Sequence, residues 1–165
     1  GVEVTMIDNG MPCVIFRASD MHISGNEAAE LLEDNVSMKD RIEAIRLACG
    51  PLMNLGDVSK KSIPKMTLVS SPMNDGTVST RTFIPHRCHK AIGVLGAVSV
   101  ATACLIEGTV AYDSAKKGNG VERHISIEHP TGEMTVIGHL NESGEMKTAA
   151  ILRTARKLMD GEVFP

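Results

Sequence analysis

Residues 81–108 read RTFIPHRCHKAIGVLGAVSVATACLIEG and contain the longest apolar run of the chain. Between Ile92 and Ile106 only Ser99 and Thr102 are conventionally polar, and no side chain is charged. A helix that is apolar on every face has to be buried on every face. We therefore predict a central helix over residues 92–106, ended by Gly108, with the other elements of the domain packed around it.

A group of cationic and titratable side chains comes directly before this helix, at His86, Arg87, His89 and Lys90. The N-terminus of a helix carries unpaired N–H groups and partial positive charge, so it attracts anions. Gly93 and Gly96 would let a ligand or a neighbouring strand approach the first turn closely. The junction predicts a site for a carboxylate-bearing ligand, in which a histidine moves a proton. The alternative is a polar loop between a strand and a helix.

The composition excludes several classes of partner. The chain has 165 residues, which is typical of one domain, and a net charge of −3. Three Phe, one Tyr and no Trp leave few stacking platforms for nucleic acid, and no basic surface is indicated. The apolar run is too short and too rich in Gly and Ser to span a membrane. We expect no nucleic-acid partner and no membrane segment.

The four cysteines lack the spacing of a disulfide framework, and we expect reduced, buried thiols in a cytoplasmic protein: Cys13, Cys49, Cys88 and Cys104. Only Cys88 has the electropositive neighbours that would lower the pKa of a thiol, but an inert role is favoured. A metal site made of His86, Cys88 and His89 is disfavoured, because no second ligand pair has matching spacing. The chain starts at Gly1 rather than Met, so we expect a part of a longer protein.

The remaining pattern predicts more strands than helices. A hairpin is expected from residues 2–7 and 13–16 through Asn9-Gly10, with later strands at 65–70, 77–84, 121–128, 133–140, 147–154 and 159–164. Helices are expected at 27–35 and from a Ser37–Asp40 capping box to Gly50-Pro51; residues 54–64 are expected to be a polar loop, and residues 110–120 to end in a flexible KKGNG loop. Tight turns between strands favour antiparallel pairing. The predicted class is α+β, with a strongly curved, mostly antiparallel sheet wrapped around one long buried central helix.

Two turns carry groups that a ligand could contact. At residues 8–12 the sequence is typical of a hairpin turn, with Asn9 or the backbone as a second, functional interpretation. At residues 128–132 Pro130 and Gly132 predict a turn that His129 could cap. For both turns the structural role is the simpler explanation.

Five motifs in order resemble the second half of the PrpF-like proteins, closest to their 4-oxalomesaconate tautomerase branch: VEVTMIDNGMPCVIFRASDM, PLMNLGDVSKKSIPKM, RTFIPHRCHKAIGVLGAVSVATACLIEG, EHPTGEMTV and ILRTARKLMDGEVFP. The resemblance implies half of a diaminopimelate-epimerase-like fold, in which two similar halves enclose a ligand cleft. Residues 1–165 would then be a single domain, the C-terminal half of a two-domain isomerase that lacks its N-terminal domain here.

The resemblance also implies an activity, a proton shift in an unsaturated keto polycarboxylate from gallate breakdown, with neither a metal nor an organic cofactor. The Lys and Cys that transfer protons in the family lie in the half that is absent. His86 and His89 would be auxiliary catalytic residues. Residues implied to bind substrate are Asn9, Met11, Arg81, Arg87, Lys90, Gly93 and Gly96. His129, Pro130 and Gly132 match a family turn in which Thr131 replaces the commoner Ser.

Two alternatives stay open. One is an isomerase of the same family that acts on methylaconitate or aconitate. The other is a non-catalytic domain for polycarboxylate binding or assembly, because half a cleft with an exposed apolar face is expected to self-associate, for example as a homodimer.

Overall fold

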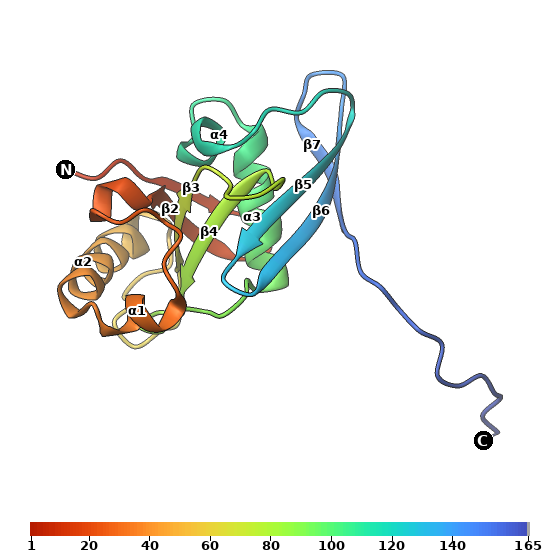
Figure 1. Cartoon of the computed structure of the whole chain (residues 1–165), viewed down its shortest axis with the longest axis horizontal. Coiled ribbons are helices and arrows are strands. Elements are labelled where there is room, and N and C mark those ends of the chain that lie inside the picture. Colours follow the sequence, from red (N-terminus) through yellow and green to blue (C-terminus); the bar gives the residue numbers. More distant parts are fainter. Residues whose placement is uncertain (165) are drawn as a thin grey trace.

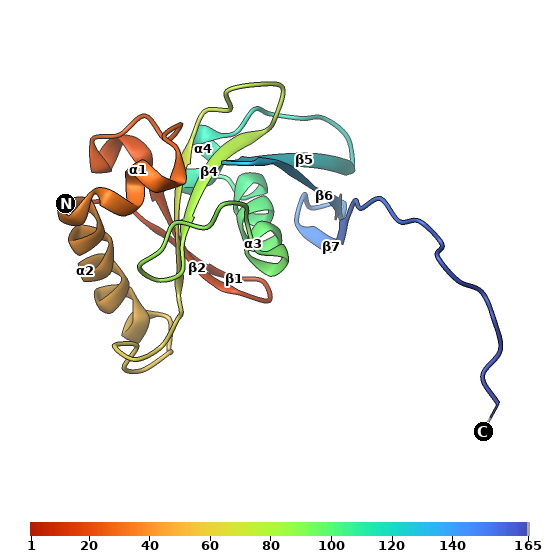
Figure 2. The ribbon, with the colours of Figure 1, turned by 60° about the horizontal axis from the view of Figure 1, so that its bottom comes forward.

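A single curled sheet organises the protein, whose computed structural model describes residues 1–164. Its seven strands pair in sequence order: β1 Thr5–Asp8, β2 Pro12–Arg17, β3 Lys65–Ser70, β4 Val78–Phe83, β5 Glu122–His129, β6 Gly132–Leu140 and β7 Met146–Ile151. The helices are η1 Ala18–Met21, α1 Ala29–Asp34, α2 Val36–Leu52, α3 Val94–Leu105 and α4 Val110–Ser114. Within residues 1–164 no helix is long and apolar enough to cross a membrane. The predicted α+β class is confirmed, with the sheet curled around α3 (Figures 1 and 2).

Two of the six strand pairings are parallel, which the turn pattern alone does not indicate. β2 pairs with β3 in parallel, and β4 pairs with β5 in parallel, while the other four pairs are antiparallel. Parallel neighbours need a long crossover. Here α1 and α2 lie between β2 and β3, and α3 and α4 lie between β4 and β5, so helices end up on both faces of the sheet (Figure 2).

Strand β2 shows how the sheet separates two cores. Its successive side chains alternate between faces, as in any strand. Cys13 and Ile15 pack with α3 and α4, whereas Val14 and Phe16 pack with α1 and α2. All four are fully buried, so β2 lies in the middle layer of a three-layer arrangement.

The prediction that the central helix is buried on every face is wrong. Exposed fractions reach 44% for Val94, 48% for Leu95 and 48% for Ile106, although Ala97, Val100 and Ala101 are fully buried. The sheet and α4 cover one side of α3, and the sheet does not close around the other side (Figure 2). An apolar flank of α3, defined here as Val94, Leu95 and Ile106, therefore remains uncovered.

Helix α2 differs from the prediction at both ends. The side chain of Asn35, rather than Ser37, caps it by accepting a hydrogen bond from Met38 N at 3.1 Å. The helix runs past Gly50 to Leu52, with Pro51 in its last turn. A Cβ on Gly50 would lie 2.5 Å from Val58 Cγ2, so this glycine permits a close contact rather than ending the helix.

A buried arginine orders the loop that Val58 belongs to. Arg46 is fully buried on α2, and its Nη1 donates to the carbonyls of Val58 at 2.9 Å and Ile63 at 2.8 Å. Glu43 balances the charge through Nε at 2.7 Å. Because a buried charge must be paired and hydrogen-bonded, this arrangement fixes residues 58–63 against the helix.

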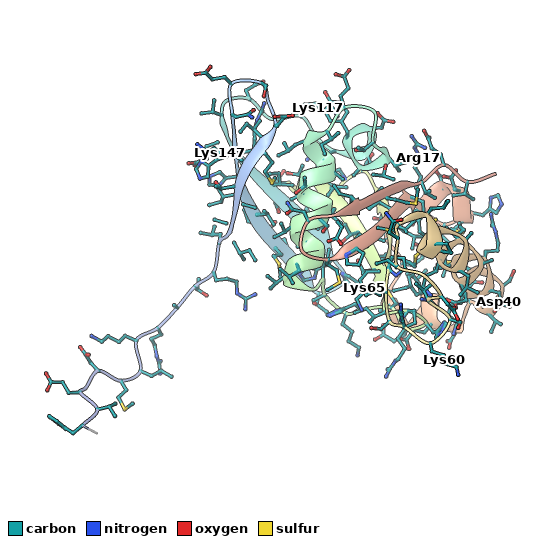
Figure 3. The ribbon with its side chains drawn as sticks, turned by 180° about the vertical axis from the view of Figure 1, so that it is seen from behind. Arg17, Asp40, Lys60, Lys65, Lys117 and Lys147 are labelled. Carbon is teal, nitrogen blue, oxygen red and sulfur yellow. The ribbon has the colours of Figure 1, made fainter. Side chains whose placement is uncertain are left out.

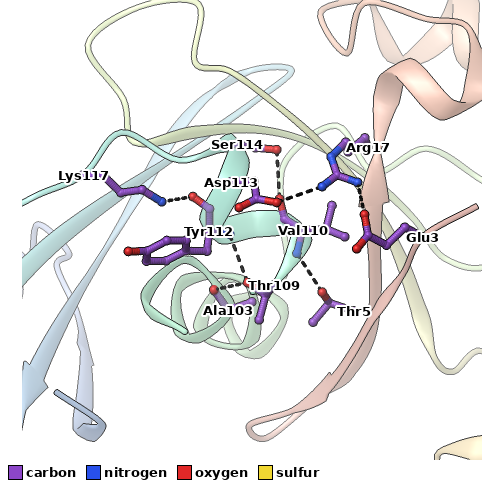
Figure 4. Close-up of polar contacts among 10 residues, drawn as sticks. All are labelled: Glu3, Thr5, Arg17, Ala103, Thr109, Val110, Tyr112, Asp113, Ser114 and Lys117. Carbon is purple, nitrogen blue, oxygen red and sulfur yellow. Dashed lines mark hydrogen bonds and ion pairs between the residues drawn. The ribbon is translucent and has the colours of Figure 1, made fainter. Parts of the chain in front are cut away.

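The C-terminal half of the chain contains one short helix that the sequence did not predict and lacks one strand that it did. Residues 110–114 form a short helix, α4, capped by Thr109, whose hydroxyl accepts from Tyr112 N at 3.1 Å. Contacts from the N-terminal segment hold it, with Val110 N donating to Thr5 Oγ1 and Arg17 bridging Asp113 and Glu3 (Figure 4). Residues 159–164 form no strand but belong to an extended tail that leaves the domain (Figure 1).

The contact between Gly50 and Val58 predicts that alanine at position 50 destabilises the protein, although helix propensity alone would predict the opposite. Alanine is favoured over glycine inside a helix by about 1 kcal/mol. Forcing extra volume into a packed site typically costs about 1–3 kcal/mol. We expect Gly50→Ala to lower the free energy of unfolding in urea denaturation, while the control Gly161→Ala, whose Cβ would meet nothing within 4 Å, leaves it unchanged. A more stable Gly50→Ala protein would contradict the packing described here.

Candidate functional site

The N-terminal end of α3 is open in this chain. Gly93 occupies the N-cap position in an extended conformation, and no side chain caps the helix. Gly93, Val94 and Leu95 are exposed, and a Cβ added at Gly93 would meet no described atom within 4 Å. The first N–H groups of a helix have no partner within the helix. This end therefore presents free donors and partial positive charge, as the sequence predicts.

Hydrogen bonds to α3 hold the β1–β2 hairpin turn against this helix, with Gly10 next to Leu95 of its first turn. Asn9 N donates to Ser99 Oγ at 3.2 Å, Ser99 Oγ donates to the Met11 carbonyl at 2.8 Å, and Asn9 Nδ2 donates to Thr102 Oγ1 at 2.9 Å. Gly10 has φ +89, which favours glycine, and a Cβ there would lie 3.4 Å from Leu95 Cδ2. The two polar residues of the apolar helix thus position the turn that carries Asn9 and Met11.

A hollow of about 550 Å³ lies between the hairpin turn, α3 and β7. Its lining comes from Asn9, Gly10, Leu95, Val98, Met146, Lys147, Thr148, Ala149 and Ile151. Figure 3 shows α3 between the hairpin and β7, which carries Lys147. Lys147 is the one charged residue of this lining, within the part of the chain that the structure describes. No sequence pattern singles out Lys147, because it stands alone at the start of a strand.

Three of the predicted residues do not surround the end of α3. Instead they face acidic side chains of the two neighbouring helices: His86 lies 3.8 Å from Glu43, Arg87 lies 3.7 Å from Glu33, and Lys90 lies 3.3 Å from Glu30. All three side chains are well exposed. Attraction to these acidic side chains of α1 and α2 favours this placement, which local sequence spacing does not reveal.

His89 belongs to the same loop and lies four residues before Gly93. Its Nδ1 accepts a hydrogen bond from Ala91 N at 2.9 Å, so a neutral ring carries its proton on Nε2. The β5–β6 turn reaches the same loop, with Thr131 Oγ1 donating to the Lys90 carbonyl at 2.8 Å. Burial, together with the charges of His89 and Arg81, lowers the pKa of His129 on this turn. Two imidazoles therefore lie at the junction of the 84–93 loop and the 129–132 turn.

Arg81 is placed on the other face of the sheet. It shares a face of β4 with Phe83, which packs in the core of α1 and α2. Its Nε donates to the Glu27 carbonyl at 2.7 Å and its Nη1 to the Thr80 carbonyl at 2.8 Å. Burial lowers the pKa of this guanidinium. The structure thus separates Arg81 from the hollow beside α3.

A buried carboxylate that the sequence did not single out orders the loop before β4. Glu128 accepts hydrogen bonds from Met73 N at 2.7 Å, Asn74 N at 2.8 Å and Gly76 N at 3.1 Å. A Cβ on Gly76 would lie 2.5 Å from Glu128 Cγ, so the glycine is required for this approach. Its position beside the His129-Pro130 turn carried no pattern that could have indicated the role.

The cysteines are all free and buried, as expected. Burial raises the pKa of Cys13 and Cys104 to about 12 and that of Cys88 to about 11. The thiolate is the reactive form, so Cys88 is held in its unreactive state at neutral pH despite its basic neighbours. Among residues 1–164 no group of three His, Cys, Asp or Glu side chains is arranged to hold a metal ion.

Comparison with known proteins gives concordant matches. The family described as "PrpF protein" matches residues 1–165. The chain is 57% identical over 164 residues to the (4E)-oxalomesaconate Delta-isomerase of Novosphingobium sp. (strain KA1), covering 99% of the chain and 46% of that protein. It is 57% identical over 163 residues to the 4-oxalomesaconate tautomerase of Pseudomonas putida (strain KT2440), covering 99% and 45%. The chain thus spans less than half the length of these relatives.

A solved structure supports the fold. The crystal structure of a methylitaconate-delta-isomerase superposes with a TM-score of 0.84 over 97% of this chain and 46% of the other, at 23% sequence identity. The curled sheet around one helix is therefore a fold already observed in half of a longer protein.

The hydrogen bonds of Ser99 give a prediction for this site. Ser99→Ala leaves the partly buried Met11 carbonyl without its donor, and a buried polar group left unsatisfied costs about 1–3 kcal/mol. We expect the free energy of unfolding from urea denaturation to fall by that amount. The exposed control Ser62→Ala should change it by less than about 0.5 kcal/mol. Equal effects of the two substitutions would show that the hairpin turn is not held through Ser99.

Proposed function

The chain belongs to the PrpF protein family, and from this membership we propose that it is the C-terminal half of a cofactor-independent isomerase. The proposed reaction is the keto–enol tautomerisation of 4-oxalomesaconate, a step of gallate degradation. The observation that carries this proposal is 57% identity, over nearly the whole chain, to two relatives named for that substrate. The more distant resemblance to a methylitaconate isomerase structure supports the fold only.

The open end of α3 suits the charge that such a reaction develops. Removing a proton next to the keto group of this substrate gives a dienolate flanked by carboxylates. Donors that already point at developing charge stabilise it most. We infer that the free N–H groups of the first turn of α3 bind a substrate carboxylate. Lys147 adds positive charge in the hollow that Leu95 of the same turn also lines.

His89 is our candidate for contact with the enolate oxygen. Its Nδ1 is occupied by the Ala91 N–H, so the neutral ring offers Nε2–H as a donor. His86 keeps the predicted auxiliary role only if its weak pairing with Glu43 opens. The groups that remove and return the proton would come from the other half of the protein, which the relatives' length implies.

The uncovered flank of α3 supports the same division of the protein into halves. Val94, Leu95 and Ile106 would be covered by the N-terminal half, or by a second copy of the chain when that half is missing. We also propose a cytoplasmic location, supported by four buried cysteines that form no disulfide with one another.

The activity assay uses the full-length protein that contains this chain, with 4-oxalomesaconate, methylaconitate and aconitate as separate substrates. We expect turnover of 4-oxalomesaconate at enzymic rates, and none with residues 1–165 alone. His89→Gln should lower kcat by about 10²-fold, a typical contribution of one proton-donating group.

The matched control is His22→Asn. His22 is exposed and has φ +60, a conformation that asparagine tolerates well, so its kcat should stay unchanged. Turnover of 4-oxalomesaconate by residues 1–165 alone would contradict the proposed division of roles. Preference for another substrate would contradict the proposed reaction.

A further inference from the structure

A second cavity lies at the opposite end of α3 from the proposed substrate site. It measures about 450 Å³, a size typical of small-molecule sites. The end of α3, the start of β5 and the loop after α4 form its walls, through residues that include Cys104, Leu105, Lys116, Lys117, Arg123 and Ile125. The twelve residues of α3 separate it from Gly93 by about 18 Å, at 1.5 Å per helical residue.

Arg123 occupies the position in this cavity where a core residue would be expected. On β5, Arg123, Ile125 and Ile127 lie on one face, since side chains alternate along a strand. Ile125 and Ile127 pack in the core around α3, and Arg123 continues their row beyond the end of that core. The guanidinium is therefore directed toward the cavity at the end of the helix.

The charge of Arg123 is not compensated by the protein. Its Nε is buried and has no hydrogen-bond partner within residues 1–164, and no carboxylate of that range forms an ion pair with the side chain. An orphaned buried donor on a charged group is costly unless a ligand or water satisfies it. Arg123 also lines the cavity, so an anion bound there would offset the charge that no carboxylate of this range pairs.

Two lysines add positive charge at the same cavity. Lys116 Nζ donates to the Asn74 carbonyl at 2.9 Å, and Lys117 Nζ donates to the Tyr112 carbonyl and lies 3.0 Å from the centre of the Tyr112 ring (Figure 4). Neither forms an ion pair with a carboxylate among residues 1–164. The lining also holds two carboxylates, Asp75 and Glu122, of which Glu122 is hydrogen-bonded to His124 at 2.9 Å. The three cations of the lining therefore outnumber its two carboxylates.

The rest of the cavity wall is apolar. It is lined by Leu105, Ile125, Leu140 and Cys104. Burial raises the pKa of the Cys104 thiol to about 12, so this thiol stays protonated. Inorganic phosphate would use the cations but leave these side chains against water. An organic anion with a compact hydrocarbon body would use both parts of the wall.

We propose that this cavity is a second ligand site, which binds a small organic dicarboxylate through Arg123 and Lys116 and is separate from the substrate site at Gly93. One carboxylate pairs with Arg123, where a planar guanidinium can bind it through two parallel hydrogen bonds. The hydrocarbon body packs on Leu105 and Ile125. This inference does not depend on the reaction proposed above.

The test uses the single tyrosine of the chain as its reporter. Tyr112 lines the cavity, and residues 1–165 contain no tryptophan, so the tyrosine emission of this chain reports on the site directly. The probe is cis-cyclohexane-1,3-dicarboxylate, which does not absorb at the excitation wavelength. The uncharged counterpart is cis-1,3-cyclohexanedimethanol, and inorganic phosphate is the anion without an apolar body. We expect a saturable change in emission with the dicarboxylate alone.

Substitution of the cation is the second part of the test. Arg123→Gln and Lys116→Gln should each weaken dicarboxylate binding by about tenfold, the typical effect of losing one charge-assisted hydrogen bond. Arg153→Gln, the same change at an exposed residue of the tail, should leave the Kd unaltered. Far-UV circular dichroism checks that each variant folds. If Arg123→Gln does not fold, Lys116→Gln still tests the site.

Two kinds of result would contradict the proposal. No saturable change with the dicarboxylate, or an unchanged Kd in folded Arg123→Gln and Lys116→Gln, overturns the site. Equally tight binding of phosphate or of the diol overturns the assignment of an organic dianion.

Discussion

Burial of α3 against the curled sheet is the interaction on which the other parts of this protein depend. A helix with no charged residue gains stability in proportion to the apolar area that it removes from water. Strands from both halves of the sheet contribute to that burial, with Ile15 of β2 and Ile127 of β5 in one core. The sheet curls because strands on either side have to reach the same helix (Figure 2). It stops short of closure, which leaves the N-terminal end of α3 accessible.

A few buried polar groups then position the loops around this framework. Ser99 fixes the hairpin turn, Arg46 fixes residues 58–63, and Glu128 fixes residues 73–76. In each case the partners are backbone groups, so a single side chain satisfies several donors or acceptors that burial would otherwise leave unpaired. Arg123 is different, since its Nε has no such partner among the described residues. This contrast is what separates a structural polar group from a candidate binding group.

Much of the fold could be predicted from the sequence because its signals are local. The hairpin at Asn9-Gly10, the strand Lys65–Ser70 and the apolar helix depend on turn residues and periodicity within a few positions. Errors arose where a distant residue decides the outcome. Gly50 was interpreted as a helix end because its contact with Val58 is not visible in the sequence. The short α4 depends on Thr5 and Arg17, about one hundred residues away.

The candidate site was predicted less completely, for the same reason. The open end of α3 and the adjacent hairpin turn were anticipated, but His86, Arg87 and Lys90 face acidic side chains of α1 and α2. Lys147 was missed because only the fold brings β7 beside the hairpin. Hydrogen exchange of the full-length protein, with and without saturating 4-oxalomesaconate, tests the central claim most directly. Slower exchange of the Val94, Leu95 and Gly96 amides with ligand is the result we predict. Unchanged exchange at these three amides, with protection elsewhere in the protein, would contradict it.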